Sequence, residues 1–383
     1  MKEEKKDRLI AALLVVIALI NISKYLTLNV LFPYAQTFGM KSYEFGYLAG
    51  SFAFLQLLSI PFSLSLANKF GLKNMLLICL IGSALSCLLV AMSQSLILIY
   101  LAKCIDGATG ANIIITNTIL SQNTSEHERL PVFSRVNISY FLAVLICPFI
   151  GGYLSTNGIR YPFYLSFLIS CISVIVCIFF LKVEGPSKRA DHENLKFKKF
   201  LTGSFDFRMM MLIVFATTSA QFGFNTLFQQ HCYGKLSLTV KDVSKIAVTM
   251  SLVAVIVQLT VKKVYARIGN LKSILSLSLL FGCICIFIIT IQSGLIPFVI
   301  TSVAFVAFYA MRSPILTSMV SHLAAENHSH GFGFNQYAIT IGQLTGSLTV
   351  AASSRYLPRY EFMSIFIFMI LSYFLVQRLK LKL

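Results

Sequence analysis

Residues 68–76 read NKFGLKNML and residues 266–275 read ARIGNLKSIL, which is the same pattern with one extra residue. Each stretch joins two long apolar runs, and each places a basic residue (Lys69 or Arg267) two positions before a glycine (Gly71 or Gly269). The glycine permits a tight turn, and basic residues such as Lys73 hold a turn at the anionic cytoplasmic leaflet. The matching order of residues predicts a chain built from two similar halves.

The composition predicts a helical membrane protein. Of the 383 residues, 57% are hydrophobic and 12% are charged, and the mean hydropathy is +0.79. A soluble domain has about 25% charged residues, so this chain lacks the polar residues for a water-facing surface. The apolar runs are long and continuous, as in membrane-spanning helices, rather than short and alternating as in membrane barrels.

Runs of about 20 apolar residues each cover a bilayer core of about 30 Å. We expect twelve spans, at residues 9–32, 45–67, 74–94, 97–121, 134–154, 162–181, 209–229, 244–265, 273–291, 295–320, 331–353 and 361–377. The fold class is therefore an all-α membrane protein with twelve transmembrane helices in two six-helix bundles. The predicted domains are residues 1–181, a basic cytoplasmic linker at 182–208, and residues 209–383.

The net charge of +18 supports membrane topology rather than binding of nucleic acid. Loops on one side of the predicted membrane hold 22 of the Lys and Arg residues, and loops on the other side hold seven. By the positive-inside rule, both termini and the central linker are cytoplasmic. Of the nine cysteines, eight lie in apolar spans and Cys232 is expected in an outer loop with Lys241, so no disulfide framework is predicted.

Three further stretches carry a family resemblance. Residues 103–111 (KCIDGATGA, including Gly107), 147–152 (CPFIGG) and 160–163 (RYPF) occur in order in the predicted spans 4, 5 and 6. Together with the turn at 68–73, they resemble the signatures of the major facilitator superfamily, especially its twelve-helix proton-coupled drug and metabolite exporters. Asn68 and Leu64 depart from the usual aspartate and glycine of the family's loop signature. The resemblance implies two bundles that rock around a central site with alternating access.

The motif in the predicted fifth span also has a direct physical reading. Pro148 removes one backbone hydrogen bond and bends the helix. Gly151 and Gly152 let a neighbouring helix approach closely, which is a main packing device within lipid. Ordinary helix packing and a role in gating are both open for these residues.

Four charged residues are predicted at membrane depth, where charges are costly and usually functional. At 1.5 Å per residue, Lys24 lies roughly 22 Å above the inner surface, and Lys103 lies roughly 9 Å below the outer surface of a 30 Å core. The two lysines thus share a level. Asp106 shares a helix face with Lys103 and is the only acid found well inside a span, so it is the candidate proton carrier. A structural Lys103–Asp106 ion pair is the alternative, and Arg312 either binds substrate or ties helices together.

Amide side chains add candidate substrate contacts. Gln221, Asn225 and Gln229 recur every four residues in the predicted seventh span, and such a stripe is poorly placed against lipid. Asn21 precedes Lys24 by one turn and belongs to the same expected cavity, although helix–helix hydrogen bonding is the alternative for all four amides. His322, His328 and His330 flank a loop, where solvated side chains are more probable than a metal site; no metal or cofactor is predicted.

The sequence therefore predicts a secondary transporter and not an enzyme, since no nucleophile–base set or nucleotide loop stands out. The preferred function is proton-coupled export, with multidrug efflux included, by an antiporter in the bacterial inner membrane. An importer of amino acids or nucleosides is the alternative, and a receptor or membrane enzyme is an alternative of another class. Three cations against one carboxylate within the spans predict an anionic or zwitterionic substrate, with Lys24 more important than Arg312. The expected partners are this small molecule, protons and the lipid bilayer, and the chain is expected to be a monomer.

Overall fold

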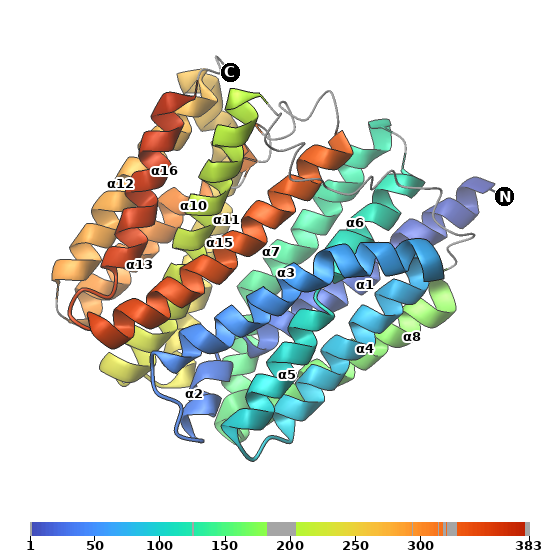
Figure 1. Ribbon diagram of the computed structural model, residues 1–383, viewed down its shortest axis with the longest axis horizontal. Coiled ribbons are helices and arrows are strands. Elements are labelled where there is room, and N and C mark those ends of the chain that lie inside the picture. The colour runs from blue at the N-terminus through green and yellow to red at the C-terminus, as the bar shows by residue number, and fades with distance from the viewer. Residues whose placement is uncertain are drawn as a thin grey trace. The chain divides into compact units, whose positions relative to one another are not determined.

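The computed structural model describes residues 2–124, 126–181, 204–292, 294–312, 314–316, 319 and 328–379, and these residues are almost entirely helical (Figure 1). The first half contains α1 (Lys2–Thr27), α2 (Leu31–Gln36), α3 (Glu44–Phe70), α4 (Leu72–Ala91), α5 (Leu96–Ala108), α6 (Asn112–Asn123), α7 (Glu126–Asn157) and α8 (Tyr161–Phe180). The second half contains α10 (Phe205–Gln230), the π-helical turn η1 (His231–Lys235), α11 (Val240–Ile268), α12 (Leu271–Ile291), α13 (Leu295–Ala310), α15 (His328–Tyr356) and α16 (Met363–Arg378).

The helices agree with the predicted spans. Within the described residues, ten helical segments have the length and apolar composition of a membrane span, and α16 is a shorter apolar helix. The remaining predicted span, 331–353, falls within α15. Each of the twelve predicted spans therefore contains a helix, and the all-α membrane fold class is confirmed.

Two predicted spans are interrupted. The first was expected to run to residue 32, but α1 ends at Thr27 and the short α2 follows. The fourth was expected to be one helix over 97–121, but it is divided into α5 and α6 by a break at Thr109–Ala111. The apolar run continues through both breaks, so hydropathy alone does not reveal them.

The described residues group into two compact units. Unit 1 contains residues 1–40, 54–191 and 239–248, and unit 2 contains residues 41–53, 192–238 and 249–383. The first residues of α3 thus pack with unit 2, and the first residues of α11 pack with unit 1. The division of the chain at 181 and 209 remains a prediction, because residues 182–203 of the proposed linker lie outside the described residues.

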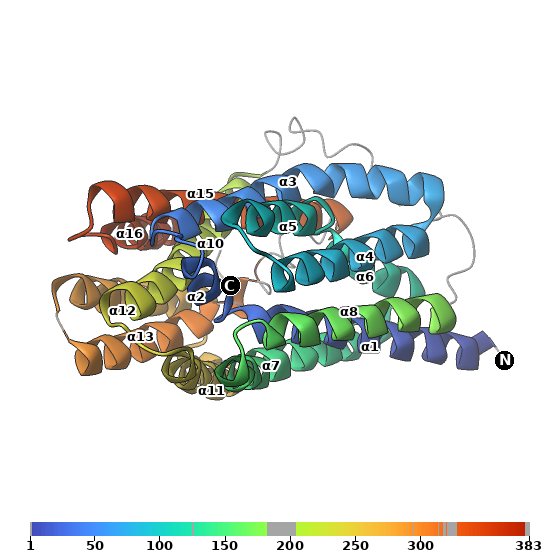
Figure 2. The same cartoon turned by 90° about the horizontal axis from the view of Figure 1, so that it is seen from below.

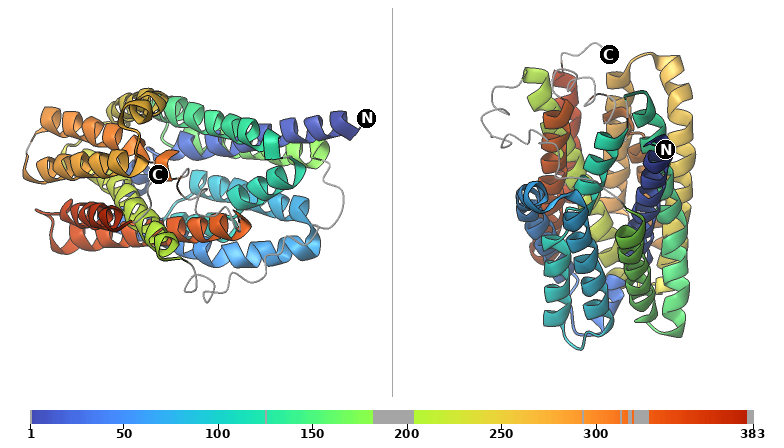
Figure 3. Two further views of the ribbon diagram at one scale, coloured as in Figure 1. Left: turned by 90° about the horizontal axis from the view of Figure 1, so that it is seen from above. Right: turned by 90° about the vertical axis from the view of Figure 1, so that its right-hand side faces the viewer.

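Each unit is held together by a few extensive helix pairs. In unit 1, α1 packs against α7 and α8, and α4 packs against α5 and α8 (Figure 2). Its core includes Leu13, Val16, Leu76 and Ile115, all fully buried. In unit 2, α10 packs against α15 and α16, and α12 packs against α13 and α16 (Figure 3). The charged and polar residues described below lie mainly on these packed helices or next to their ends.

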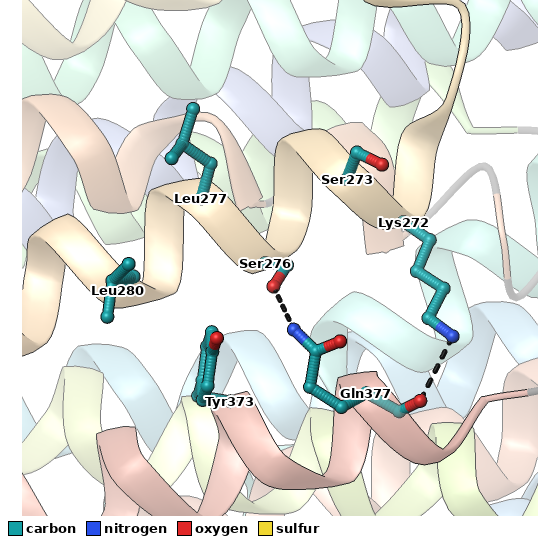
Figure 4. A pocket seen from close by; sticks show the side chains of 7 residues that line it. All are labelled: Lys272, Ser273, Ser276, Leu277, Leu280, Tyr373 and Gln377. Carbon is teal, nitrogen blue, oxygen red and sulfur yellow. Dashed lines mark hydrogen bonds between the residues drawn. The ribbon is translucent and has the colours of Figure 1, made fainter.

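The sequence repeat is also a structural repeat. Gly71 and Gly269 have φ values of 89° and 68°, in the left-handed region that glycine adopts without a steric penalty. Lys73 Nζ donates to the carbonyl of Ile178 at 2.9 Å, in the last turn of α8. Lys272 Nζ donates to the carbonyl of Gln377 at 3.0 Å, in the last turn of α16, where it lines a surface pocket (Figure 4). Both lysines therefore hold a helix C-terminus 105 residues ahead in the chain, where a cation is favourable.

Candidate functional site

The ion pair predicted within the fourth span is present on α5. Lys103 Nζ lies 3.0 Å from Asp106 Oδ2, and the two side chains are 21% and 24% exposed. Ser83 of α4 donates to the second carboxylate oxygen, Oδ1, at 3.3 Å. Asp106 is therefore held by a cation from its own helix and by a hydroxyl from the neighbouring helix. This arrangement stabilises a carboxylate but leaves it partly open to solvent.

Lys24 of α1 belongs to the same electrostatic group. Its charge lies close enough to those of Asp106 and Lys103 for an electrostatic interaction with each. Its side chain is exposed on unit 1, whereas Lys103 is partly covered. The three residues carry a formal surplus of one positive charge, so an anion approaching this group would meet a net attraction.

The break in the fourth span lies one turn beyond Asp106. Gly107 is buried in the last turn of α5, and Thr109 caps that helix. Gln56 of α3 donates from Nε2 to the carbonyl of Gly110 at 2.9 Å, which satisfies a group in the break. Non-helical backbone at membrane depth is tolerated only where protein or a water-filled cavity surrounds it, and transporters use such breaks at binding sites.

A buried hydroxyl cluster behind this group was missed by the sequence analysis. Ser23 Oγ of α1 lies 2.6 Å from Ser166 Oγ and 2.8 Å from Ser170 Oγ, both on α8. Cys87 Sγ of α4 lies 3.3 Å from Ser166 Oγ. Single serines in apolar helices gave no usable signal, because the cluster exists only where the three helices meet.

Asn21 differs from the expected cavity residue. It is 9% exposed, and its Nδ2 donates to Ser139 Oγ of α7 at 3.5 Å. Its amide thus contacts a neighbouring helix, which matches the helix–helix alternative. A role in substrate binding remains a prediction.

Arg312 lies in unit 2, just after α13, and donates hydrogen bonds to two residues of α10. Its Nη1 donates to Thr217 Oγ1 at 2.6 Å and its Nη2 donates to Gln221 Oε1 at 2.8 Å. The guanidinium also stacks over the Tyr309 ring, 4.5 Å from the centroid. With 8% of its surface exposed, Arg312 has the contacts of a residue that ties two helices together.

The amide stripe of α10 is divided rather than uniform. Gln221 binds Arg312, Asn225 is exposed, and Gln229 is 4% exposed. The stripe was expected to face one cavity, but α15 and α16 both pack on α10 and Gln229 is buried. Of the three amides, Asn225 is the one whose side chain remains open.

The glycines of the fifth span lie at close helix contacts. A Cβ atom on Gly151 would collide with the backbone carbonyl of Leu26 on α1, and one on Gly152 would collide with the Ser244 side chain at the start of α11. The helix α7 continues through Pro148, which is buried. These contacts agree with the close packing expected from the sequence, and the gating role remains a prediction.

Other predicted positions need correction or lie outside the description. Cys232 was expected in an exposed loop, but it lies in η1 and is fully buried, because α10 continues directly into this turn. Glu361, at the first position of the predicted twelfth span, is a second acid with little exposed surface, at 6%; the expectation that Asp106 alone lies well inside a span remains a prediction. His322 and the side chains of His328 and His330 lie outside the described residues. In the residues that are described, no group of three His, Cys, Asp or Glu could hold a metal.

Comparison with known proteins identifies the family. The model of the Major Facilitator Superfamily matches residues 12–347. The chain belongs to the major facilitator superfamily.

Similar proteins include bacterial drug-resistance transporters. This major facilitator chain is 28% identical over 311 residues to multidrug resistance protein 2 of Bacillus subtilis, which covers 79% of this chain and 77% of the relative. It is 22% identical over 332 residues to the quinolone resistance protein NorA of Staphylococcus aureus, with 85% of each chain covered. Among solved structures, a point mutant of the nucleoside transporter NupG has a TM-score of 0.79 at 12% identity, with 97% of this chain and 100% of that chain covered. The last likeness establishes the fold alone.

Membership of this family makes the chain a transporter and an integral membrane protein rather than an enzyme. The predicted major facilitator fold is therefore confirmed.

Proposed function

We propose that this major facilitator transporter exports small anionic or zwitterionic compounds in exchange for protons. The proposal rests on the Lys24–Lys103–Asp106 group of unit 1. These three charged residues belong to two predicted membrane spans, and Asp106 lies one turn before the break that follows α5. Such charges are retained in membranes mainly for function. The protein would act in the bacterial inner membrane with both termini in the cytoplasm, as the basic loops predict.

Asp106 is the proposed proton carrier. Its carboxylate is paired with Lys103 at 3.0 Å and accepts from Ser83, so protonation would cost both interactions. An anion bound by Lys24 and Lys103 would compete with Asp106 for Lys103. Loss of this cationic partner favours protonation of Asp106. Substrate binding and proton binding would thereby be linked through Lys103.

The substrate class follows from charge. Lys24 and Lys103 exceed Asp106 by one positive charge, and lysine binds carboxylates and phosphates by charge-assisted hydrogen bonds. Two relatives are named for resistance to multiple drugs and to quinolones, and quinolones carry a carboxylate. An organic acid, a carboxylate-bearing siderophore or an acidic drug would fit this group.

Transport by purified protein in liposomes tests the proposal. We expect a quinolone to move against its gradient when a pH gradient is imposed, and Asp106→Asn to abolish this movement while binding persists. Asp242→Asn is the matched control, since Asp242 is an acid in the first turn of α11 whose side chain is 46% exposed. Normal proton-driven flux in Asp106→Asn would make the ion pair structural. Proton-driven transport of amino acids or nucleosides in the direction opposite to export would favour the alternative that the protein is an importer.

A further inference from the structure

A second charged cluster lies in unit 2, where α10 ends and α16 begins. The Glu361 side chain is 7% exposed, and its Oε1 accepts from Lys235 Nζ at 2.8 Å. The same oxygen lies 3.0 Å from His231 Nδ1. A buried carboxylate is costly unless charged or polar partners compensate it. Here His231 and Lys235 both contact Oε1 of Glu361. This cluster is separate from the Lys24–Lys103–Asp106 group.

The geometry defines which ring nitrogen of His231 can take up a proton. An ionised carboxylate only accepts hydrogen bonds, so Nδ1 carries the hydrogen that points to Glu361. The lone pair of the neutral ring is then on Nε2, and a hydronium ion can give its proton there, leaving water, while the Nδ1 hydrogen bond to Glu361 stays intact. Histidine is the side chain that ordinarily changes charge between about pH 5 and 8.

The surroundings of the ring are aromatic. His231 stacks on Phe298 of α13 with centroids 4.5 Å apart, and it meets Phe362 edge-on at 5.6 Å. The other titratable groups next to the cluster in the chain are Cys232 and Tyr233 of η1, Arg355 and Tyr356 of α15, and Arg359 and Tyr360 of the connection into α16. Arg355 stacks over Tyr43 and Tyr356, and Arg359 stacks over Tyr360. His231 and Lys235 are therefore the cations with a defined contact to Glu361 among the described residues.

The cluster joins three helices. His231 and Lys235 belong to the π-helical turn that continues α10, and π-helical turns are frequent at functional sites. The Glu361 carbonyl accepts from Ser353 of α15 and from Ser364 of α16, and Lys235 also donates to the carbonyl of Pro358 at 2.9 Å. A change of charge at His231 thus acts where the α15–α16 connection is attached to α10.

We propose that His231, Lys235 and Glu361 form a proton-binding site, in which protonation of His231 tightens the attachment of the α15–α16 connection to α10. The imidazolium makes a charge-assisted hydrogen bond to Glu361, which is roughly twice as strong as the bond from a neutral ring. Lys235 supplies a second positive charge at the same carboxylate oxygen. With the predicted topology, the site lies at the outer end of unit 2, where protons would enter. Its use in the transport cycle rests on the proposed proton coupling, whereas proton binding does not.

Proton binding can be read by fluorescence, because the sequence contains no tryptophan. In Phe362→Trp, the indole would replace the ring that contacts His231, and an imidazolium beside an indole quenches its emission. We expect emission to fall as the pH is lowered, because protonation of His231 places an imidazolium beside the indole. Adding His231→Gln should abolish this fall, and its persistence would overturn the assignment to His231.

The attachment of the connection can be read by hydrogen exchange in the protein without tryptophan. After correction for the intrinsic rate, amides of residues 353–363 should exchange about fivefold more slowly near pH 5.5 than near pH 7.5, from the roughly doubled strength of the charged hydrogen bond. His231→Gln and Glu361→Gln should each lose this ratio. Lys235→Gln should exchange faster at both pH values and keep the ratio. A ratio unchanged in His231→Gln would overturn the proposal, and would do so even if Phe362→Trp failed to fold.

Flux separates this proposal from the transport proposal. If wild-type protein shows no proton-driven quinolone flux but retains the exchange ratio, the proton site stands and the coupling fails. If flux is proton-driven and the ratio is absent, the coupling stands and the His231 site fails. With both correct, His231→Gln should flatten the dependence of flux on external pH.

Discussion

At the scale of single residues, the cationic side chains of Lys24 and Arg312 have different environments. Lys24 is exposed near Asp106 and Lys103. Arg312 is buried and donates to Thr217 and Gln221. A charge that is accessible can meet a substrate, whereas a charge already bound within a unit contributes to its packing. The two residues should therefore fail in different ways when they are replaced.

We predict that Lys24→Gln weakens binding of a carboxylate-bearing ligand about tenfold, which corresponds to about 1.4 kcal/mol. The loss follows from one charge-assisted hydrogen bond. The thermal midpoint should stay near that of the unmodified protein, because Lys24 is exposed. Equilibrium binding of a quinolone to purified protein measures the first effect, and a melting curve measures the second.

Arg312→Gln serves as the comparison within the same experiments. It removes two charge-assisted hydrogen bonds, at about 1.5 kcal/mol or more each. We expect a clearly lower melting temperature and lower abundance. Equal loss of affinity in the two variants, with unchanged melting of Arg312→Gln, would contradict the distinction drawn between them.

At the scale of helices, glycine positions decide how closely neighbours approach. Gly151 of α7 faces the Leu26 carbonyl so closely that a Cβ atom cannot fit, whereas the nearest atoms to a Cβ on Gly223 of α10 would lie at 3.3 to 3.5 Å. A rigid backbone atom cannot yield as a side chain can. The two sites therefore offer a matched pair of helical glycines.

Gly151→Ala should destabilise the protein by about 1–3 kcal/mol, the usual cost of overpacking. Gly223→Ala should be nearly neutral, since its contacts are close to ordinary packing distances and alanine favours a helix more than glycine does. Melting temperatures of the two purified variants make the comparison. Equal stability of both would show that α1 and α7 separate without cost.

At the scale of the whole chain, topology is the property that the charge distribution predicts most directly. Labelling of Cys232 with a membrane-impermeant thiol reagent would not report topology, because this residue is fully buried. Lys241 is exposed at the start of α11 and provides a better position. It lies on the side predicted to face outward.

In a variant without native cysteines, Lys241→Cys should be labelled in intact cells. Lys69→Cys, in the last turn of α3, should be labelled only after the cells are permeabilised. Both expectations follow from the excess of Lys and Arg in the loops predicted to be cytoplasmic. The reversed pattern would place both termini outside.

The membrane fold, the helical spans and the repeat of Gly71 and Gly269 could all be predicted from the sequence. These properties depend on residues close together in the chain: an apolar run of sufficient length, a glycine at a turn, and a lysine beside it. The Lys103–Asp106 pair was predictable for the same reason, because residues three apart share a face of one helix.

Only the tertiary structure decided the remaining features of the two clusters. Glu361 and His231 are 130 residues apart, so no local pattern relates them. The break at Gly110 depends on Gln56 from another helix, and the burial of Cys232 depends on the helix that continues into η1. Hydropathy predicts whether a residue is favourable in lipid or in a protein interior. It does not predict which side chain that residue contacts there. That choice is made by the packing of helices distant in sequence.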